Sequence, residues 1–503
     1  MLITDYLTLN AQKYPNSEAI AYIDSNNQRS SISWGELDTL SNQVANLLKR
    51  KNIIKGEKVG ILLQNSIVWL PIYFGILKSG VVAVLLNYNQ SIDEIEYCVE
   101  RADCKGVFLS RQDKCYSCLA QKELWICDFN DSRELCTLLE KCPKSLNYNT
   151  ISSEDVAAIY FSSGTTGRSK AILISHKSLI SAAQMELFHH NQCSDDHFLC
   201  LSPLYHTGSK IHWFGSLLVG GSIVLYDSSM SPKNILDIIE KEKISVTFFL
   251  VPQIQDILDA IDVGDVNIKK FKFSQWRLMH SGAQHVPKTL INRWHEHFPL
   301  QSYDTNYGLT ESTGPGCIHL GIDNINKAGA IGKPDPEWEV DIVNQGKSVD
   351  IGTSGELIIK GPGVMMGYYK DEESTKEVLI NGWLHTGDMA YMDKDGYIYI
   401  AGRKKDVIIS GGENIYPAQI ENFYRKLPHI HDVAIIGFPN SRMGELVAAV
   451  IEFKDNCSYS KKELMDYSLE LPAYQRPCKF IIKKIIRNSL GKIDKKEMRR
   501  RYL

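Results

Sequence analysis

The stretch from Tyr160 to Lys170 has the residue types needed to bind an anion such as a phosphate. It reads YFSSGTTGRSK, an aromatic pair followed by serines, threonines and glycines and then by a lysine. Glycine lets the backbone approach a ligand closely, and successive N–H groups with nearby hydroxyls form an anion-binding concavity. The lysine adds a point charge suited to phosphate. The stretch is not a Walker A loop, because Ser169 and Ala171 stand where that motif needs glycine and serine or threonine.

Two short apolar runs, residues 156–161 and 171–174, flank this stretch and predict buried strands. A polar hairpin turn between the two strands is therefore the alternative interpretation. Short glycine turns are common, but a turn this rich in hydroxyl groups and ending in a lysine is less so. We therefore favour a loop that binds phosphate.

A second stretch, from Tyr303 to Ser312, reads YDTNYGLTES. It offers an aromatic face for a purine, a threonine hydroxyl for a phosphate and a carboxylate for a hard cation. By itself this stretch fits an ordinary loop equally well. Glu311 is the only carboxylate from Tyr307 to Ser312, so a cation bound at this end of the stretch would be assigned to it.

Three short motifs in the middle of the chain are compatible with ligand binding but weak alone. His206 lies in the run LSPLYHTG, and an isolated histidine is more often structural than catalytic. A small-residue turn, SGAQ at 281–284, follows an apolar run, where α/β sheets bind ligands and where ordinary turns also occur. Asp388 ends the run GWLHTGD, which we interpret as a rigid loop whose carboxylate accepts hydrogen bonds from ribose hydroxyls.

Three motifs in the last hundred or so residues can also be interpreted without any ligand. The charged run GRKKD at 402–406 has the composition of a solvated linker. The run SGGEN at 410–414 contains glycines that would let a thin ligand pass close to the backbone. Lys492 follows a glycine in the run SLGK, within a basic tail where a lysine is normally surface charge.

Together these motifs resemble the signatures of the adenylate-forming superfamily, which includes acyl-CoA synthetases, luciferase-like enzymes and adenylation domains of peptide synthetases. The resemblance spans nearly the whole chain, and the motifs occur in the expected order, so a chance match is not credible. It is closest to acyl-CoA synthetases acting on fatty or aryl acids. One departure is visible, because the family usually has proline where this chain has Ser169.

The resemblance implies a role for each candidate residue. Glu311 would bind Mg²⁺, Tyr307 would pack on adenine and Thr310 would contact the α-phosphate. The catalytic residues would be Lys492, Thr310, Glu311 and His206. The residues binding ATP or coenzyme A would be Ser162, Ser163, Gly164, Thr165, Thr166, Gly167, Lys170, Gly282, Ala283, Gln284, Tyr307, Gly308, Asp388, Arg403, Gly411 and Gly412.

The 503 residues exceed one ordinary core, so at least two domains are expected. Alternating strand and helix patterns predict an α/β fold: a large N-terminal domain of layered α/β sheets with a β-rich subdomain, and a small α+β C-terminal lid. The resemblance places the boundary in the charged run. Residues 1–403 would be the adenylation domain and 404–503 the mobile lid, with Lys405 at the hinge.

Composition and charge limit the kinds of partner and compartment that we expect for this protein. The net charge of −3 favours neither nucleic acid nor an anionic membrane. The most apolar stretch, 69–86, is interrupted by proline, glycines and a lysine, so we expect a helix and a strand there and no transmembrane segment. The first ten residues lack a secretory signal, which predicts a cytoplasmic protein with reduced cysteines. The close cysteine pair at 115 and 118 has no companion at zinc-finger spacing.

The implied reaction has two steps. A carboxylate attacks the α-phosphate of ATP, giving acyl-AMP and pyrophosphate, and the thiol of coenzyme A then displaces AMP. One alternative is an acyl-AMP ligase that loads an acyl carrier protein, and another is a nucleotide-binding relative without turnover. The oligomeric state is left open.

The sequence determines the carboxylic acid substrate less well than it determines the reaction. Amino-acid-activating relatives usually carry an aspartate where this chain has Tyr205 and His206, so an amino-acid substrate is not expected. The apolar and aromatic residues that follow fit a pocket for a fatty or aryl tail, but they fit a hydrophobic core equally well. They are Ile211, Trp213, Phe214 and Leu217.

Overall fold

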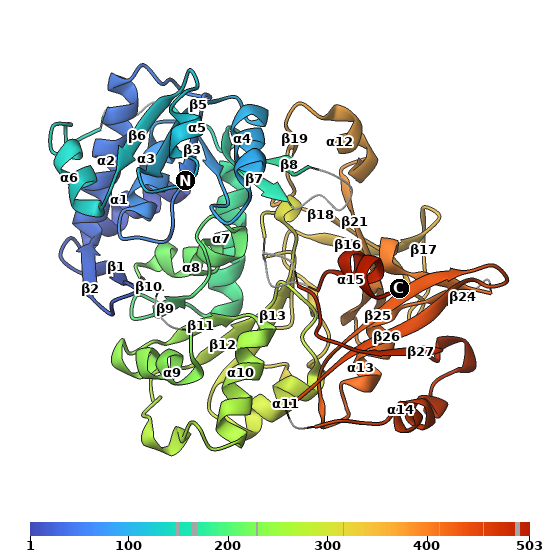
Figure 1. Ribbon diagram of the computed structural model, residues 1–503. Helices are drawn as coiled ribbons and strands as arrows, with labels where there is room; N and C mark the ends of the chain where they lie inside the picture. Colours follow the sequence, from blue (N-terminus) through green and yellow to red (C-terminus); the bar gives the residue numbers. More distant parts are fainter. Residues whose placement is uncertain are drawn as a thin grey trace.

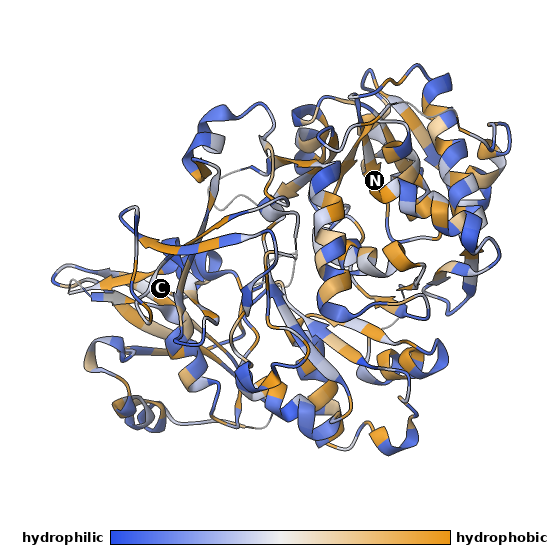
Figure 2. Ribbon diagram, turned by 180° about the vertical axis from the view of Figure 1, so that it is seen from behind, coloured by the Kyte–Doolittle hydropathy of each residue, from blue (hydrophilic) through white to orange (hydrophobic). Residues whose placement is uncertain are grey.

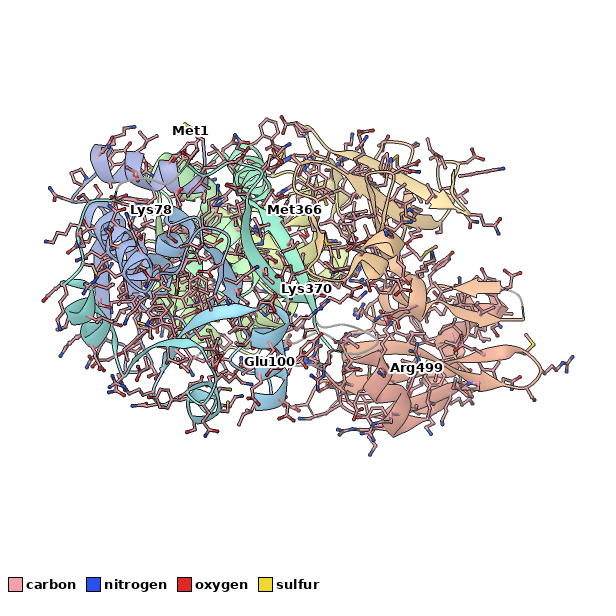
Figure 3. All side chains as sticks on the ribbon, turned by 90° about the horizontal axis from the view of Figure 1, so that it is seen from above. Met1, Lys78, Glu100, Met366, Lys370 and Arg499 are labelled. Carbon is pink, nitrogen blue, oxygen red and sulfur yellow. The ribbon has the colours of Figure 1, made fainter. Side chains whose placement is uncertain are left out.

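Two large sheets of mostly parallel strands form the N-terminal part of the protein, and two smaller, mostly antiparallel sheets follow them (Figure 1). The structure is a computed structural model that describes residues 1–146, 150–162, 168–227, 230–314, 316–411, 413–455, 457–487 and 493–503. Met1 and Arg499 lie on opposite sides when the molecule is seen from above (Figure 3). The predicted fold class, layered α/β sheets followed by a small α+β unit, is confirmed.

The first large sheet has seven strands in the order β19-β8-β7-β4-β3-β5-β6. Its strands are β3 (Lys58–Leu62), β4 (Val82–Leu85), β5 (Cys104–Ser110), β6 (Trp125–Phe129), β7 (Val156–Ser162), β8 (Lys170–Ser175) and β19 (Gly367–Tyr368). Strands β3 to β7 pair in parallel, whereas β8 returns antiparallel to β7. The last edge strand, β19, comes from almost two hundred residues further along the chain and pairs with β8.

The second large sheet has nine strands in the order β15-β14-β13-β12-β11-β9-β10-β1-β2. They are β1 (Glu18–Ile23), β2 (Arg29–Ser33), β9 (His197–Cys200), β10 (Ser222–Tyr226), β11 (Val246–Phe249), β12 (Leu278–Ser281), β13 (Ser302–Tyr307), β14 (Ile318–His319) and β15 (Lys333–Pro334). Because β9 to β13 are parallel, their carboxyl ends lie at one edge, where ligands bind in such sheets.

Helices cover and separate these sheets (Figure 1). In the N-terminal part they are α1 (Ile3–Lys13), α2 (Trp34–Arg50), α3 (Trp69–Lys78), α4 (Ile92–Arg101), α5 (Tyr116–Leu119), α6 (Ser132–Leu139), α7 (His176–His190), α8 (Thr207–Val219), α9 (Pro232–Lys241), α10 (Val251–Asp262), α11 (Lys288–His297) and α12 (Glu372–Val378). Short 3₁₀ turns are η1 (Ile268–Lys270), η2 (Thr310–Ser312) and η3 (Ile325–Lys327). Helices α7 and α8 pack together between the two sheets, so residues near them can contact both.

The main core lies between the sheets and around α3, all of whose residues are buried. Trp34 of α2 stacks on Trp213 of α8 with ring centroids 6.3 Å apart. The apolar stretch 69–86 is therefore a core helix and strand, as predicted. Apolar residues gather on the strands, while polar residues lie on the outer faces of the helices (Figure 2). Among the described residues, no helix is both long enough and apolar enough to cross a bilayer. All twelve cysteines are free thiols.

The third sheet is the predicted β-rich subdomain. Its strands are β16 (Glu339–Asn344), β17 (Lys347–Ser348), β18 (Gly355–Lys360), β20 (Leu379–Ile380), β21 (Trp383–Met392) and β22 (Ile398–Arg403). Asp388 lies inside strand β21 and not on a loop as expected, because its run continues the antiparallel pairing with β22. The strand position holds the carboxylate more rigidly than a loop would.

The C-terminal sheet begins after the 3₁₀ turn η4 (Lys404–Asp406). Its elements are β23 (Ile408–Ser410), β24 (Glu413–Ile415), α13 (Pro417–Tyr424), β25 (Ile430–Asn440), β26 (Gly444–Phe453), α14 (Lys461–Tyr467), η5 (Ser468–Glu470), η6 (Ala473–Gln475), β27 (Lys479–Ile482) and α15 (Lys495–Tyr502). Strand β25 continues through Pro439 and Asn440, and helix α13 ends at Tyr424.

Candidate active site

A cavity of about 1130 Å³ lies where residues from all four sheets meet. Most of the sequence-predicted site residues that the structure describes line it. They are Ser162, Lys170, His206, Ala283, Gln284, Tyr307, Gly308, Thr310, Glu311, Asp388 and Arg403. Ser163, Gly164, Thr165, Thr166, Gly167, Gly412 and Lys492 lie outside the described residues. The structure therefore brings together motifs that are far apart in the sequence.

The glycine- and hydroxyl-rich stretch joins the two antiparallel strands β7 and β8. Ser162 pairs directly with Lys170 across the hairpin, and both residues line the cavity. The hairpin interpretation and the ligand-binding interpretation are therefore compatible. Lys170 is the first residue of β8 and lies at the cavity wall.

Glu311 and Lys170 are linked through a tyrosine, Tyr368 of strand β19. The hydroxyl of Tyr368 donates a hydrogen bond to Glu311 Oε1 at 3.1 Å, and the Lys170 ammonium lies 4.7 Å from the centre of the Tyr368 ring. Strand β19 pairs with β8 beside Lys170, and this pairing places Tyr368 there. The result is a carboxylate and an ammonium at one end of the cavity, with an aromatic ring between them.

A second polar group, made of Tyr307, Asp388 and Arg403, forms another wall. Asp388 and Arg403 are paired across strands β21 and β22, and Arg403 Nε lies 2.7 Å from Asp388 Oδ1. The Tyr307 hydroxyl donates to Asp388 Oδ2 at 2.5 Å. Burial and the nearby Asp388 carboxylate raise the pKa of Tyr307 well above its usual value, so the phenol keeps its proton. Burial lowers the pKa of Arg403, but Asp388 together with Tyr307, Glu311 and Asp406 raises it overall.

His206 lies at the start of α8, where its backbone is held by a buried lysine. Lys210 Nζ donates to the carbonyl of Leu204 at 2.8 Å and to that of His206 at 3.2 Å. The Lys210 ammonium also lies 4.6 Å from the centre of the Tyr160 ring. Burial lowers the pKa of Lys210 well below its usual value. Sequence reasoning missed Lys210, because a lysine in an apolar helix is ordinarily assigned to the surface.

The apolar residues after His206 belong to the core. Ile211, Trp213, Phe214 and Leu217 are fully buried in the main hydrophobic cluster and do not line the cavity. Of the two interpretations left open, core packing is therefore confirmed. The wall beside His206 is instead mixed, with aromatic Tyr205 and Phe248 and polar Ser209, His212 and Asn306.

The turn after β12 contributes Ala283 and Gln284 to the cavity, and Ala283 has a left-handed φ of +65°. Gly282 does not line the cavity. It lies behind the turn, where an added Cβ would come within 3.0 Å of the Asn306 side-chain oxygen. Gly282 thus serves close packing of the turn against β13.

The C-terminal sheet closes the remaining side. Arg487 and Ile493 form a β-bridge and both line the cavity, and these residues bracket the undescribed segment that contains Lys492. Lys405 also lines the cavity, and burial lowers its pKa. Gly411 is exposed, with a φ of +60°, and is not part of the cavity wall.

Comparison with known proteins decides the family. The AMP-binding enzyme family matches residues 7–369. The chain belongs to this family. A probable CoA ligase, CCL5, from Humulus lupulus is 30% identical over 502 residues, covering 95% of this chain and 89% of its own. The prediction of an adenylate-forming enzyme is therefore confirmed.

Other members of the AMP-binding family are similar over their whole length. A feruloyl-CoA synthase from Amycolatopsis sp is 29% identical over 476 residues, covering 94% of each chain. The crystal structure of ATP-bound MatB from Rhodopseudomonas palustris superposes with a TM-score of 0.90 at 25% identity, covering 100% of this chain and 99% of that one. These relatives agree with the predicted class, AMP-forming acid–thiol ligases.

Proposed function

We propose that the protein is an ATP-dependent carboxylic acid–CoA ligase that forms an acyl-AMP and then transfers the acyl group to coenzyme A. One observation carries this proposal. Ser162 and Lys170, which flank the glycine- and hydroxyl-rich stretch, line the same cavity as Glu311, Asp388 and Arg403. The alternatives are a ligase that loads an acyl carrier protein and a relative without turnover.

The nucleotide would lie between the two polar groups of the cavity. Asp388 would accept hydrogen bonds from ribose hydroxyls and Tyr307 would pack on adenine, while Arg403 would contact the ribose and a phosphate. Ser162 and Lys170, with residues 163–167 of the same motif, would surround the triphosphate, and Thr310 would contact the α-phosphate. Glu311 fits Mg²⁺, because hard cations prefer carboxylate oxygen and this carboxylate lines the cavity, with Tyr368 donating to its Oε1. Bound Mg²⁺ would neutralise charge on the phosphates.

The two steps would use different parts of the C-terminal unit. We propose that residues 404–503 form a lid that moves about Lys405 relative to residues 1–403. Lys492 would donate to the phosphate or carboxylate oxygens during adenylation. The exposed Gly411, with Gly412 next to it in the sequence, would let the thiol arm of coenzyme A pass in the second step, since glycine leaves room beside the backbone.

The test of the proposed function is product analysis with both acceptors. Purified protein is incubated with ATP, Mg²⁺ and an acid panel, and pyrophosphate release is followed with free coenzyme A or with an acyl carrier protein. Pyrophosphate together with an acyl-CoA supports the proposal. Acyl transfer only to the carrier protein supports the first alternative, and no pyrophosphate with any acid supports the second.

The mixed wall beside His206 predicts which acids react best. Tyr205 and Phe248 offer aromatic faces, while Ser209, His212 and Asn306 offer hydrogen-bonding groups that a saturated chain would leave unpaired. We expect kcat/KM for an aryl acid with a hydroxyl or amino substituent to exceed that for an alkyl acid of equal size by about tenfold or more. Equal values for the two acids would contradict this prediction. An unmodified α-amino acid should be a poor substrate, because its ammonium group would be buried without a counter-charge.

Asp388 gives a prediction for nucleotide binding. In Asp388→Asn the charged acceptor for ribose hydroxyls is lost and Arg403 loses its partner, so the KM for ATP should rise roughly 10- to 100-fold. The matched control is Asp395→Asn, a carboxylate on the exposed turn between β21 and β22. An unchanged KM for ATP in Asp388→Asn, with the variant folded by circular dichroism, would argue against the ribose assignment.

A further inference from the structure

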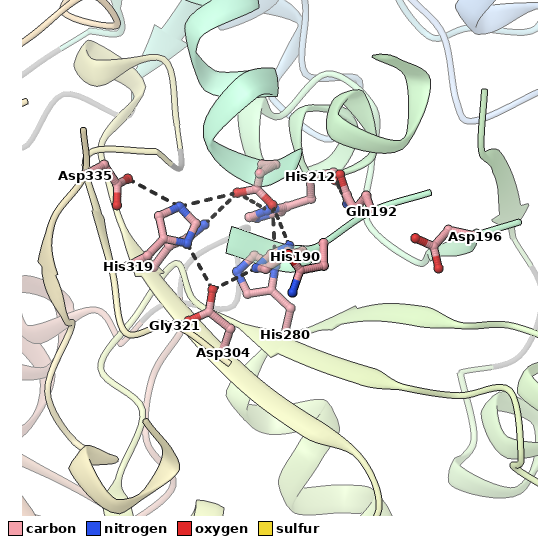
Figure 4. Close-up of polar contacts among 12 residues, drawn as sticks. His190, Gln192, Asp196, His212, His280, Asp304, His319, Gly321 and Asp335 are labelled. Carbon is pink, nitrogen blue, oxygen red and sulfur yellow. Dashed lines mark hydrogen bonds and ion pairs between the residues drawn. The ribbon is translucent and has the colours of Figure 1, made fainter. Parts of the chain in front are cut away.

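A group of ionisable side chains is buried beside the cavity, which one of its members, His212, lines, and the proposed bond-forming steps use none of them (Figure 4). It joins helices α7 and α8 to strands β12, β13 and β14. All of its members are at most 2% exposed. They are Glu186, His190, His212, His280, Asp304 and His319.

The atoms at the centre of this group are close together without forming hydrogen bonds. Glu186 Oε2 lies 3.1 Å from His190 Nδ1 and 3.9 Å from His280 Nδ1. None of these three atoms has a hydrogen-bond partner, and the second ring nitrogen of His280 has none either. Buried polar atoms are nearly always paired, so a cluster of unpaired ones calls for an unseen partner.

A metal ion explains both the short distances and the missing alignment. Ligands of a tetrahedral zinc ion, bonded at about 2.0–2.2 Å, lie about 3.3 Å from one another and point at the ion instead of at each other. One ligand atom each from Glu186, His190 and His280 already lies within 4.8 Å of the others. Glu186 and His190 are four residues apart on α7 and therefore share one face of that helix.

The surroundings have the pattern of a second coordination shell. Metal-binding histidines usually direct their other ring nitrogen at a carboxylate. His190 does so, since its Nε2 lies 2.7 Å from Asp304 Oδ2. Asp304 is held in turn by His319 Nδ1 at 3.0 Å and by the Gly321 N–H at 2.8 Å. Asn306 Nδ2 donates to Glu186 Oε1 at 2.9 Å, which orients the central carboxylate.

The charge of the surroundings favours a cation here. Three buried carboxylates lie in or beside the group: Glu186, Asp304 and Asp335, whose Oδ2 is 3.6 Å from His319 Nε2. A divalent cation bound to Glu186 would offset part of this negative charge while the imidazoles stay uncharged.

We propose that Glu186, His190 and His280 bind a divalent transition metal ion of the zinc type, separate from the Mg²⁺ that accompanies ATP. Two imidazoles and one carboxylate are a donor set that suits zinc, and three protein ligands leave one position for water. The ion would fix α7 to β12 behind the acyl end of the cavity. His212, which lines that cavity and lies 3.2 Å from Glu186 Oε1, would be positioned by the same carboxylate.

The first experiment uses the wild-type protein without a histidine tag. Metal content is measured by inductively coupled plasma mass spectrometry, and we expect about one zinc per chain after gel filtration. Protein stripped with a chelator under mild denaturant should regain zinc, with a Tm a few degrees above that of the stripped form. Transition metal below about 0.1 per chain, with no change of Tm on adding zinc, would overturn the proposal.

One variant and two controls locate the ion. Glu186→Gln keeps the shape of the side chain but removes the charge, and it should lose the zinc. Glu311→Gln removes a carboxylate from the ATP site and should retain it, as should His297→Gln, whose histidine pairs with Asp262 near the surface. If Glu186→Gln does not fold, Co²⁺ added to the stripped wild type reports the ligands through its visible spectrum. A tetrahedral Co²⁺ spectrum supports the site, and the spectrum of hydrated Co²⁺ overturns it.

Discussion

Replacing Glu311 by glutamine should lower the rate of pyrophosphate release by about two orders of magnitude or more, with the fold intact. Glutamine has nearly the same shape but lacks the negative charge that a hard cation requires. The structure places this carboxylate on the cavity wall, with Oε1 accepting from Tyr368 and the Lys170 ammonium beyond the same ring. Loss of the charge would therefore remove the proposed Mg²⁺ ligand and leave the phosphates less neutralised.

The matched variant is Tyr368→Phe, which removes the hydroxyl that contacts Glu311 but keeps the ring and the carboxylate. Its rate of pyrophosphate release should fall only about tenfold, since one hydrogen bond to a charged group is lost. Raising the Mg²⁺ concentration should partly restore Glu311→Gln if the defect is in metal binding. A near-normal rate in Glu311→Gln at limiting Mg²⁺ would show that another group binds the metal.

Most of the secondary structure near the site could be predicted from local patterns. The apolar runs at 156–161 and 171–174 are strands β7 and β8, and α2 starts with a capping box that Ser33 and Glu36 form. Such features depend on neighbours within four residues, which the sequence displays directly. Asp388 was expected on a loop but lies in strand β21. The expectation was wrong because this part of the strand contains turn-forming residues such as Gly387.

Contacts between distant segments could not be predicted in the same way. Strand β19 lies in the sequence between β18 and β20 of the third sheet, but it pairs with β8 of the first sheet. Only this pairing brings Tyr368 to Glu311. The histidines at 190, 280 and 319 meet only when α7 packs against β12 and β14, and no spacing along the chain places them together. The resemblance supplied residue roles for the nucleotide site, but it contained no information on this buried group.

The proposed movement of the C-terminal unit gives the second prediction with a large effect. Arg487 and Ile493, the described residues on either side of the segment that contains Lys492, both line the cavity, and the proposed mechanism assigns Lys492 to the first half-reaction. Lys492→Ala should therefore lower acyl-AMP formation by roughly 10²- to 10³-fold. Conversion of supplied acyl-AMP and coenzyme A into thioester should change little, because Lys492 would then face away from the substrate.

Lys405→Pro should have the opposite effect on the two half-reactions. Lys405 lies in the 3₁₀ turn η4, and the φ range of 3₁₀ helices, about −50° to −70°, includes the φ near −65° that proline imposes. Proline therefore fits the arrangement seen here and would hinder the proposed dihedral change that brings the Gly411 loop to the cavity. Acyl-AMP formation should stay within a few-fold of wild type, while thioester formation should fall. The measurements are the two half-reaction rates for each purified variant. Equal loss of both half-reactions in both variants would mean that the C-terminal unit does not alternate between them.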